Sequence, residues 1–257
     1  MADERGDKPS LLRETDEEAR HLARTLVRGA RYMALAVLDP QTGFPSASRA
    51  LTATDLDGVP VILASALSGH TKGLAQDPRC SLLAGELGKG DPLAHPRITL
   101  QCLAELVDRP GPDHDRIRER FLDHHPKAAL YVDFPDFRFF RLVPQSASLN
   151  GGFGRAYALG ADDLVLAELP DPADWLDLQR TLRGMSDLAS AVAEKLTTEK
   201  GGAWRFAGID PAGFDLIASE RQIRHEFQQP MSTSQAAYDY ISSVLTVNAR
   251  GIPSPKN

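Results

Sequence analysis

The sequence predicts an α+β fold in which an antiparallel β-barrel precedes a smaller C-terminal α/β domain. In the first 160 residues, short β-type runs alternate with turn residues and few helical segments, which is typical of a small barrel closed on itself. After Asp162 the pattern changes to two helical segments, three short strands and a last helix. The 257 residues suffice for two ordinary domains. We place the boundary at Pro170-Asp-Pro172.

The barrel domain is predicted to span residues 15–168, after a charged N-terminal tail of residues 1–14. Its first helix begins at Thr15-Asp-Glu-Glu18, a capping-box pattern, and ends at Gly29. The further predicted helices are His70–Gln76, Asp113–His124 and Pro126–Tyr131. The predicted strands are Tyr32–Leu38, Ser46–Leu56, Val59–Ser65, Arg79–Leu87, Arg97–Val107, Arg138–Val143 and Ser146–Leu159.

The second predicted domain, residues 169–257, combines helices with a three-stranded sheet. Its last helix is predicted to begin at Ser232-Thr-Ser-Gln235, an N-cap pattern, and to end at Gly251. The preceding elements are the helices Trp175–Arg183 and Leu188–Thr197 and the strands Ala203–Ile209, Phe214–Ala218 and Gln222–Phe227.

Composition excludes several classes of protein. With 42% apolar and 25% charged residues and no low-complexity stretch, the chain is neither collagen-like, nor a coiled coil, nor disordered. The longest apolar run, Tyr32–Leu38, is far shorter than a membrane-spanning helix. The charged start of the chain lacks the apolar region of a secretory signal, and the net charge of −6 argues against a nucleic-acid surface. We therefore expect a cytoplasmic protein with no membrane and no nucleic-acid partner.

The cysteines and histidines indicate no metal site. Cys80 and Cys102 lie in apolar runs and are predicted to be reduced thiols in the core. The seven histidines are scattered without metal-ligand spacing. We interpret the pair His124-His125 as a solvated helix end.

The stretch from Ser65 to Arg79 carries the strongest signal for a binding site. A strand ends among clustered hydroxyls, and a helical turn then opens with Thr71 and Lys72 near its N-terminus, where free N–H groups suit an anion. Arg49, on an earlier strand, supplies a guanidinium that suits the same phosphate. The alternative is that Ser68 or Thr71 only caps the helix and that both cations are surface charges.

A second feature is the glycine-rich segment Leu149–Tyr157, with Gly151, Gly152 and Gly154 in four positions. Inside a strand, such glycines indicate a bulge or the close approach of a flat ligand to the backbone. A barrel corner turned by glycines explains the same pattern.

Together these motifs resemble the pyridoxamine 5'-phosphate oxidase-like FMN-binding split barrels. The resemblance rests on the order of Ser46–Thr52, Ser65–Lys72 with Asp77-Pro78-Arg79, the strand that contains Gln101, and Phe139–Pro144 running into Gly151–Ala156. Within this group the chain is most similar to the haem-utilisation (HugZ-type) branch, whose members add a C-terminal α/β domain.

The resemblance implies a homodimer that holds FMN in a groove at the subunit interface. The implied positions are Arg49 and Lys72 at the phosphate, Ser65, His70 and Thr71 around the phosphate and ribityl chain, Ala50 and Leu51 facing the ring through their backbone, and Gln101 at the ring edge. Such a flavin performs the redox step while the protein orients it.

The sequence also departs from the haem-utilisation branch. Gly73 stands where the branch usually has Asn, Gly184-Met-Ser-Asp-Leu replaces a histidine-bearing opening of the C-terminal domain, and no histidine follows His225. Arg155, beside Gly152, matches the family arginine that lies on the open face of haem.

Three functions follow from these features. The leading hypothesis is an FMN-dependent oxidoreductase acting on an unidentified small molecule, with no catalytic residue assigned. The first alternative is a protein of iron utilisation that binds or degrades haem near Gly152 and Arg155, with His225 or His70 as iron ligand. The second is a non-enzymatic binding or regulatory protein that has lost the cofactor.

Overall fold

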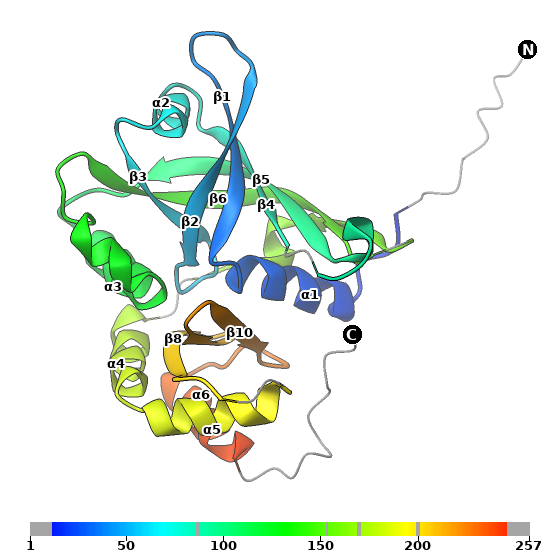
Figure 1. Cartoon of the computed structure of the whole chain (residues 1–257), viewed down its shortest axis with the longest axis vertical. Coiled ribbons are helices and arrows are strands. Elements are labelled where there is room, and N and C mark those ends of the chain that lie inside the picture. Colours follow the sequence, from blue (N-terminus) through cyan, green and yellow to red (C-terminus); the bar gives the residue numbers. More distant parts are fainter. Residues whose placement is uncertain (1–11, 86–87, 153, 169–170, 199–200, 246–257) are drawn as a thin grey trace, which may run out of the picture.

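The computed structural model describes residues 12–85, 88–152, 154–168, 171–198 and 201–245, which form a β-barrel and a C-terminal unit of helices and a sheet (Figure 1). Parts of several predictions lie outside these residues: the tail up to residue 11, the strand end at 86–87, residue 153 of the predicted strand Ser146–Leu159, the boundary residue Pro170 and the helix end at Gly251. The predicted boundary between residues 168 and 169 stays a prediction.

The barrel is a closed ring of six antiparallel strands with a seventh strand added, which confirms the predicted fold class. The strands are β1 (Tyr32–Leu38), β2 (Pro45–Thr54), β3 (Pro60–Ser65), β4 (Arg79–Ala84), β5 (Arg97–Leu106), β6 (Phe137–Asn150) and β7 (Ala156–Gly160). They are ordered β3-β2-β1-β4-β5-β6, and the β3–β6 pairing closes the ring. Alternate apolar side chains such as Leu35, Leu82 and Leu100 fill its interior, because successive strand residues point to opposite faces.

Three α-helices belong to the barrel: α1 (Glu17–Arg28), α2 (Gly69–Gln76) and α3 (Pro112–His124). Helix α1 packs Ala19, Ala23 and Val27 against the barrel core. Its N-cap is Asp16, which accepts from the Ala19 N–H, and not Thr15 as the capping-box pattern suggests, because the Thr15 hydroxyl donates to the Ala158 carbonyl. No helix in the described ranges is long and apolar enough to cross a membrane.

Strand β6 corrects the predicted break near Pro144. The strand runs unbroken through fourteen residues, and the register against β5 skips Gln145, so that the extra residue forms a bulge. The bulge lets pairing continue past a proline that has no N–H to donate. The strand also ends earlier than predicted, at Asn150, because Gly152 and Gly154 adopt positive φ angles of 102° and 70° and turn the chain into β7.

The C-terminal unit contains α4 (Pro172–Arg183), α5 (Ser186–Leu196), α6 (Ser234–Val244) and the antiparallel strands β8 (Arg205–Asp210), β9 (Gly213–Ala218) and β10 (Arg221–Glu226). Its own core includes Trp175, Trp204 and Phe214. The helices α4, α5 and α6 and the three strands were all predicted, and the N-cap of α6 is Thr233 within the predicted cap sequence.

A buried charge cluster joins the two units where α1 and α3 meet the C-terminal sheet (Figure 1). The Arg224 guanidinium bonds to Asp210, Asp215 and Glu226 with N–O distances between 2.7 and 3.2 Å. From the barrel side, Arg28 lies 3.3 Å from Asp210 and Arg120 lies 3.9 Å from it. Arg24, whose side chain is 21% exposed, lies 3.4 Å from Glu226 at the rim of the cluster. The other three arginines and the three carboxylates are each at most 1% exposed.

The same junction corrects the interpretation of His124 and His125 as a solvated helix end. His124 is 1% exposed, with Nδ1 3.1 Å from the Arg120 carbonyl and Nε2 3.4 Å from Asp215. His125 is also buried, and its Nε2 lies 2.7 Å from the Thr52 carbonyl. Both imidazoles are buried because strands from both units cover the end of α3.

Candidate functional site

The predicted site lies at an open edge of the barrel. Strand β2 pairs with β1 from Pro45 to Leu51, but with β3 only over Thr52–Thr54. Beyond Thr52, β3 leaves β2 and pairs with β6. Among the described residues, no strand covers the second edge of residues 45–51, so their backbone N–H and C=O groups are available to a ligand. Arg49, Ala50 and Leu51, predicted to contact the cofactor, all lie on this edge.

Two cations of the predicted site carry charges that nothing in the described chain neutralises. Arg49 and Lys72 are exposed, and neither forms an ion pair with a described residue. The Arg49 guanidinium instead lies over the ring of Tyr32, 5.0 Å from its centroid, a cation–π contact. By contrast, neighbouring Arg79 is paired with Asp77. Unpaired cations at an open edge suit an anionic ligand.

The hydroxyls of the predicted site are occupied within the protein. Ser65 donates to Asp136 over 2.7 Å and accepts the Leu67 N–H. Ser68 is the N-cap of α2, and its hydroxyl oxygen is 2.7 Å from that of Thr71. The cap that the sequence analysis kept as an alternative therefore exists. The Ser65 and Thr71 hydroxyls shape the turn, which leaves Lys72 and the first amides of α2 to face a ligand.

His70 connects α2 to Ser48 of β2, on the face of the strand opposite to the Arg49 side chain. Its Nδ1 lies 3.1 Å from the Ser48 hydroxyl, and burial lowers the pKa of the half-buried ring, so His70 is neutral at pH 7. No described residue bonds to its Nε2. Helix α2 sits close to β1 because Gly73 has no side chain: a Cβ there would lie 2.9 Å from the Leu38 carbonyl oxygen. The close packing of α2 on β1 therefore favours glycine at this position.

Gln101 lies on the same outer sheet face as Arg49, but not beside it. The register aligns Gln101 with Ser81, Ala36 and Ala47, the last of these on β2. Three strand spacings of about 4.8 Å separate β2 from β5, so within one chain Gln101 lies about 14 Å from the strand that carries Arg49. The Gln101 amide oxygen accepts from Ser146 over 2.9 Å. A ligand at Arg49 therefore meets Gln101 only if it is long or if a second copy supplies it.

The outer face between Arg49 and Gln101 is apolar and exposed. Large side chains on it include Tyr32, Leu51, Leu83 and Leu103, between 38% and 47% exposed. The residues between them are small: Ala34, Ala47, Ser81, Thr99 and Ser148. Such a flat face suits a planar ligand or the same face of a second copy.

Arg155 and Gly152 lie at the other end of β6 from the Ser65 turn. Ser65 pairs with Phe137, the first residue of β6, whereas Gly152 follows its last residue. The Arg155 guanidinium donates to Glu18 over 2.8 Å, and hydrogen bonds to Tyr157 and Glu18 raise its pKa. A Cβ on Gly152 would lie 3.0 Å from the Ala94 carbonyl oxygen, so protein backbone fills the space that a flat ligand needs. One chain therefore does not bring these residues to the β2 edge.

His225 serves the core of the C-terminal unit. Its Nε2 lies 2.9 Å from the Tyr240 hydroxyl, and its ring packs against those of Phe214 and Phe227. Burial, assisted by the charge of Arg224, lowers the pKa of His225 to about 4. Each of the two histidines considered as iron ligands has one hydrogen-bonded ring nitrogen, but only His70 lies at the β2 edge, whereas His225 is packed among aromatic rings.

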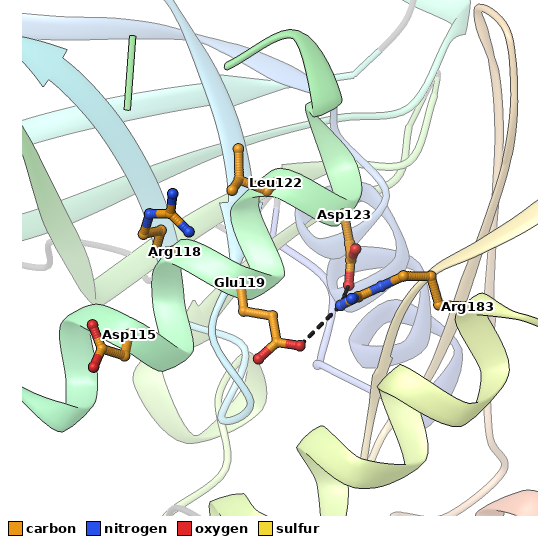
Figure 2. Close-up of a pocket in the computed structure, with 6 residues that line it drawn as sticks. All are labelled: Asp115, Arg118, Glu119, Leu122, Asp123 and Arg183. Atoms are coloured by element: carbon orange, nitrogen blue, oxygen red, sulfur yellow. Dashed lines mark hydrogen bonds and ion pairs between the residues drawn. The ribbon is translucent and has the colours of Figure 1, made fainter. Parts of the chain in front are cut away.

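The structure also shows a pocket of about 330 Å³ between α3 and α4, which the sequence analysis missed. Figure 2 shows Arg183 pointing at Glu119 and Asp123, at 2.9 and 2.7 Å. Arg118, on the same rim, pairs with Asp133. These charges neutralise one another, so the pocket offers no free group for catalysis. Its ion pairs instead connect α3 of the barrel to α4 of the C-terminal unit. In the described ranges, no cluster of three metal-ligating side chains occurs.

Sequence comparison identifies the barrel. Residues 14–164 match the family model described as CREG, β-barrel. The chloroplastic haem oxygenase HOZ of Arabidopsis thaliana is 35% identical over 166 residues, which cover 62% of this chain and 49% of HOZ. The chain thus spans about half the length of this relative.

Two solved structures resemble both units of the protein. The protein Atu2129 (unknown function) from Agrobacterium tumefaciens is 28% identical with a TM-score of 0.73, over 89% of this chain and 95% of that one. A haem-binding protein from Mycobacterium smegmatis is 26% identical with a TM-score of 0.54, over 94% and 98% of the two chains.

Proposed function

Because the chain belongs to the CREG β-barrel family, we propose that it binds haem at the open β2 edge and acts as a haem oxygenase-type enzyme of iron utilisation. The observation that carries this proposal is the combination, at the open β2 edge, of Arg49 and Lys72, both unpaired among described residues, with His70. Arg49 lies on the exposed apolar face of β2, and His70 bonds Ser48 on the opposite face of the same edge strand. The relationship to HOZ and to the haem-binding protein from M. smegmatis supports haem over FMN.

The residues at this edge fit the three chemical parts of haem. Arg49 and Lys72 offer charge-assisted bonds to the propionate carboxylates. The face with Tyr32 and Leu51 offers apolar contact to the flat ring. His70, with Nδ1–H donating to Ser48, would present the Nε2 lone pair to the iron.

Bound haem would supply the iron at which dioxygen is reduced. The protein's own residues would anchor the propionates, hold the His70 imidazole neutral through burial, and exclude water from one side of the ring through the apolar face. Arg155 and His225 have no part in this proposal, because both are bonded elsewhere in the chain.

A second copy of the chain completes the site in this proposal. The apolar outer face leaves large side chains such as Leu83 and Leu103 exposed, and one copy keeps Gln101 about 14 Å from the β2 edge. Packing two such faces would bury the apolar residues and place a groove between the copies. Sedimentation of wild type should give a dimer, and Leu83→Glu should give a monomer that binds haemin weakly; a wild-type monomer with full affinity contradicts this arrangement.

FMN is the second candidate ligand. The unpaired cations and the first amides of α2, capped by Ser68, suit a phosphate as well as a carboxylate. An FMN complex would support the flavin oxidoreductase predicted from the sequence. A protein that takes up neither ligand would be the non-enzymatic alternative.

The deciding experiment is a parallel titration of the purified protein with haemin and with FMN, followed by absorbance and flavin fluorescence. We expect haemin to produce a saturable Soret band. We also expect this band to disappear when ascorbate is added in air. Arg49→Ala and Lys72→Ala should each weaken binding about ten- to hundredfold, the effect of one charge-assisted bond. Arg79→Ala is the matched control, because it removes a neighbouring cation that is already paired with Asp77.

Histidine variants test the iron ligand. His70→Ala should shift the Soret band, whereas His225→Phe, which keeps an aromatic ring in the core, should leave it in place. Two results would overturn the assignment of the site. One is unchanged haemin affinity in Arg49→Ala and Lys72→Ala. The other is a Soret spectrum that changes in His225→Phe and not in His70→Ala.

A further inference from the structure

Cys80 and Cys102 face each other inside the barrel. They are direct partners in the antiparallel pairing of β4 and β5. Two residues further along each strand, the Ala104 N–H donates to the Pro78 carbonyl over 2.8 Å, so the cysteines also occupy a hydrogen-bonded pair position. At such positions the Cα atoms are about 5.5 Å apart. The Cα atoms of disulfide-bonded cysteines are about 4.4–6.8 Å apart, so the strand pairing holds the two backbones at a separation that a disulfide can bridge.

The two thiols are free, buried and in contact. Their exposed fractions are 7% and 3%, which confirms the prediction of reduced core thiols. A hydrogen bond from Cys102 lowers the pKa of Cys80, while the same bond and burial raise the pKa of Cys102. The hydrogen bond thus favours the thiolate of Cys80 over that of Cys102, which makes Cys80 the better nucleophile of the pair.

We propose that Cys80 and Cys102 form a reversible thiol–disulfide couple that hydrogen peroxide oxidises. The Cys80 sulfur attacks the O–O bond, keeps one oxygen as a sulfenic acid, and the other oxygen leaves as water. The Cys102 sulfur then attacks the Cys80 sulfur, the S–O bond breaks, and the second oxygen leaves as water. Two thiols thus lose one hydrogen each, and the peroxide gains two electrons; a dithiol reverses the reaction by exchange.

The couple lies directly behind the outer sheet face. Gln101 and Ser81, the next pair along β4 and β5, point to that face, whereas the cysteines point into the core. A covalent bond at this position would link the two strands through their interior. The proposal does not depend on haem binding, because it involves only residues of the chain itself.

Intact-mass measurement on the full-length protein without added haem tests the couple. After treatment with hydrogen peroxide we expect a mass lower by about 2 Da, no uptake of N-ethylmaleimide after unfolding, and recovery of both thiols with dithiothreitol. The wild-type result requires no variant and therefore no assumption about folding. Three results would each overturn the proposal. Both thiols could still react with N-ethylmaleimide after peroxide treatment, the disulfide could join two separate chains, or oxidation could occur only when the protein is unfolded in urea.

Single variants test which sulfur attacks. In Cys102→Ala, Cys80 should accumulate as a sulfenic acid that dimedone traps. In Cys80→Ala, dimedone labelling of Cys102 should be at least about tenfold slower, because the pKa of that thiol is raised. Equal labelling of the two variants, with melting temperatures that show both to be folded, would reject Cys80 as the nucleophile.

Discussion

Replacing Arg224 by methionine should strongly destabilise the protein, because Arg224 is the centre of the buried charge cluster between the two units. The substitution leaves Arg28 and Arg120 near Asp210 and Arg24 near Glu226, but it removes the arginine that pairs with Asp215. Methionine keeps the apolar stem of the side chain and removes the guanidinium with its four hydrogen bonds of 2.7–3.2 Å.

The expected loss is about 4 kcal/mol in the free energy of unfolding, since removing one partner of a buried ion pair typically costs about 3–5 kcal/mol. Adding Asp215→Asn to Arg224→Met removes the uncompensated carboxylate, so the double variant should recover about 2 kcal/mol or more.

Urea unfolding measures these changes, and the sequence provides a local probe. Its two tryptophans, Trp175 and Trp204, are both buried in the C-terminal core, so their fluorescence reports that unit, while far-UV circular dichroism reports the whole chain. A loss below about 1 kcal/mol for Arg224→Met, or a further loss on adding Asp215→Asn, would refute the assignment of this cluster as an ion-paired junction between the two units.

Three further predictions concern single positions. Burial lowers the pKa of His125 to about 4, below the unfolded value of about 6.5, so from pH 7 to 5 the unfolded state alone takes up this proton. His125 should therefore lower the free energy of unfolding by about 2 kcal/mol between pH 7 and pH 5, and His125→Gln should remove that part of the pH dependence. The same change in unfolding free energy with pH in wild type and His125→Gln would contradict this prediction. Gly73→Ala places a Cβ 2.9 Å from the Leu38 carbonyl oxygen, so it should lower the free energy of unfolding by about 1–3 kcal/mol, measured by thermal melting, and weaken haemin binding. Unchanged haemin affinity would show that α2 is not part of the site. Gly152→Ala, at a φ of 102°, should cost about 1–2 kcal/mol in urea and leave haemin affinity unchanged, since Gly152 lies away from the β2 edge.

The outline of the site was predictable because its signals are local. An N-cap serine followed within four residues by Thr71 and Lys72 indicates a helix start whatever surrounds it, and the structure contains that cap at Ser68. The partners of these residues were not predictable. Ser48 lies 22 positions from His70, and Asp136 lies 71 positions from Ser65, so only the pairing of distant strands brings them together.

The glycine segment and the histidine pair show the same limit. Glycines predict a special backbone at 151–154, but whether they bend a strand or reverse it depends on the hydrogen bonds that β6 and β7 form. His124 and His125 have the pattern of an exposed helix end. They are buried because Asp215 and the Thr52 carbonyl approach from other elements.

By itself, the sequence determined the alternation of the strands, the helix caps, the division into a barrel and a C-terminal unit, and the residue types available to an anionic ligand. These follow from periodicity and local chemistry, which act over a few residues. The tertiary structure decided which residues meet. It places no described carboxylate within ion-pair distance of Arg49 or Lys72, packs His225 in the aromatic core, and places Cys80 opposite Cys102. Such contacts depend on strand register, and a shift of one residue would turn each side chain to the opposite face.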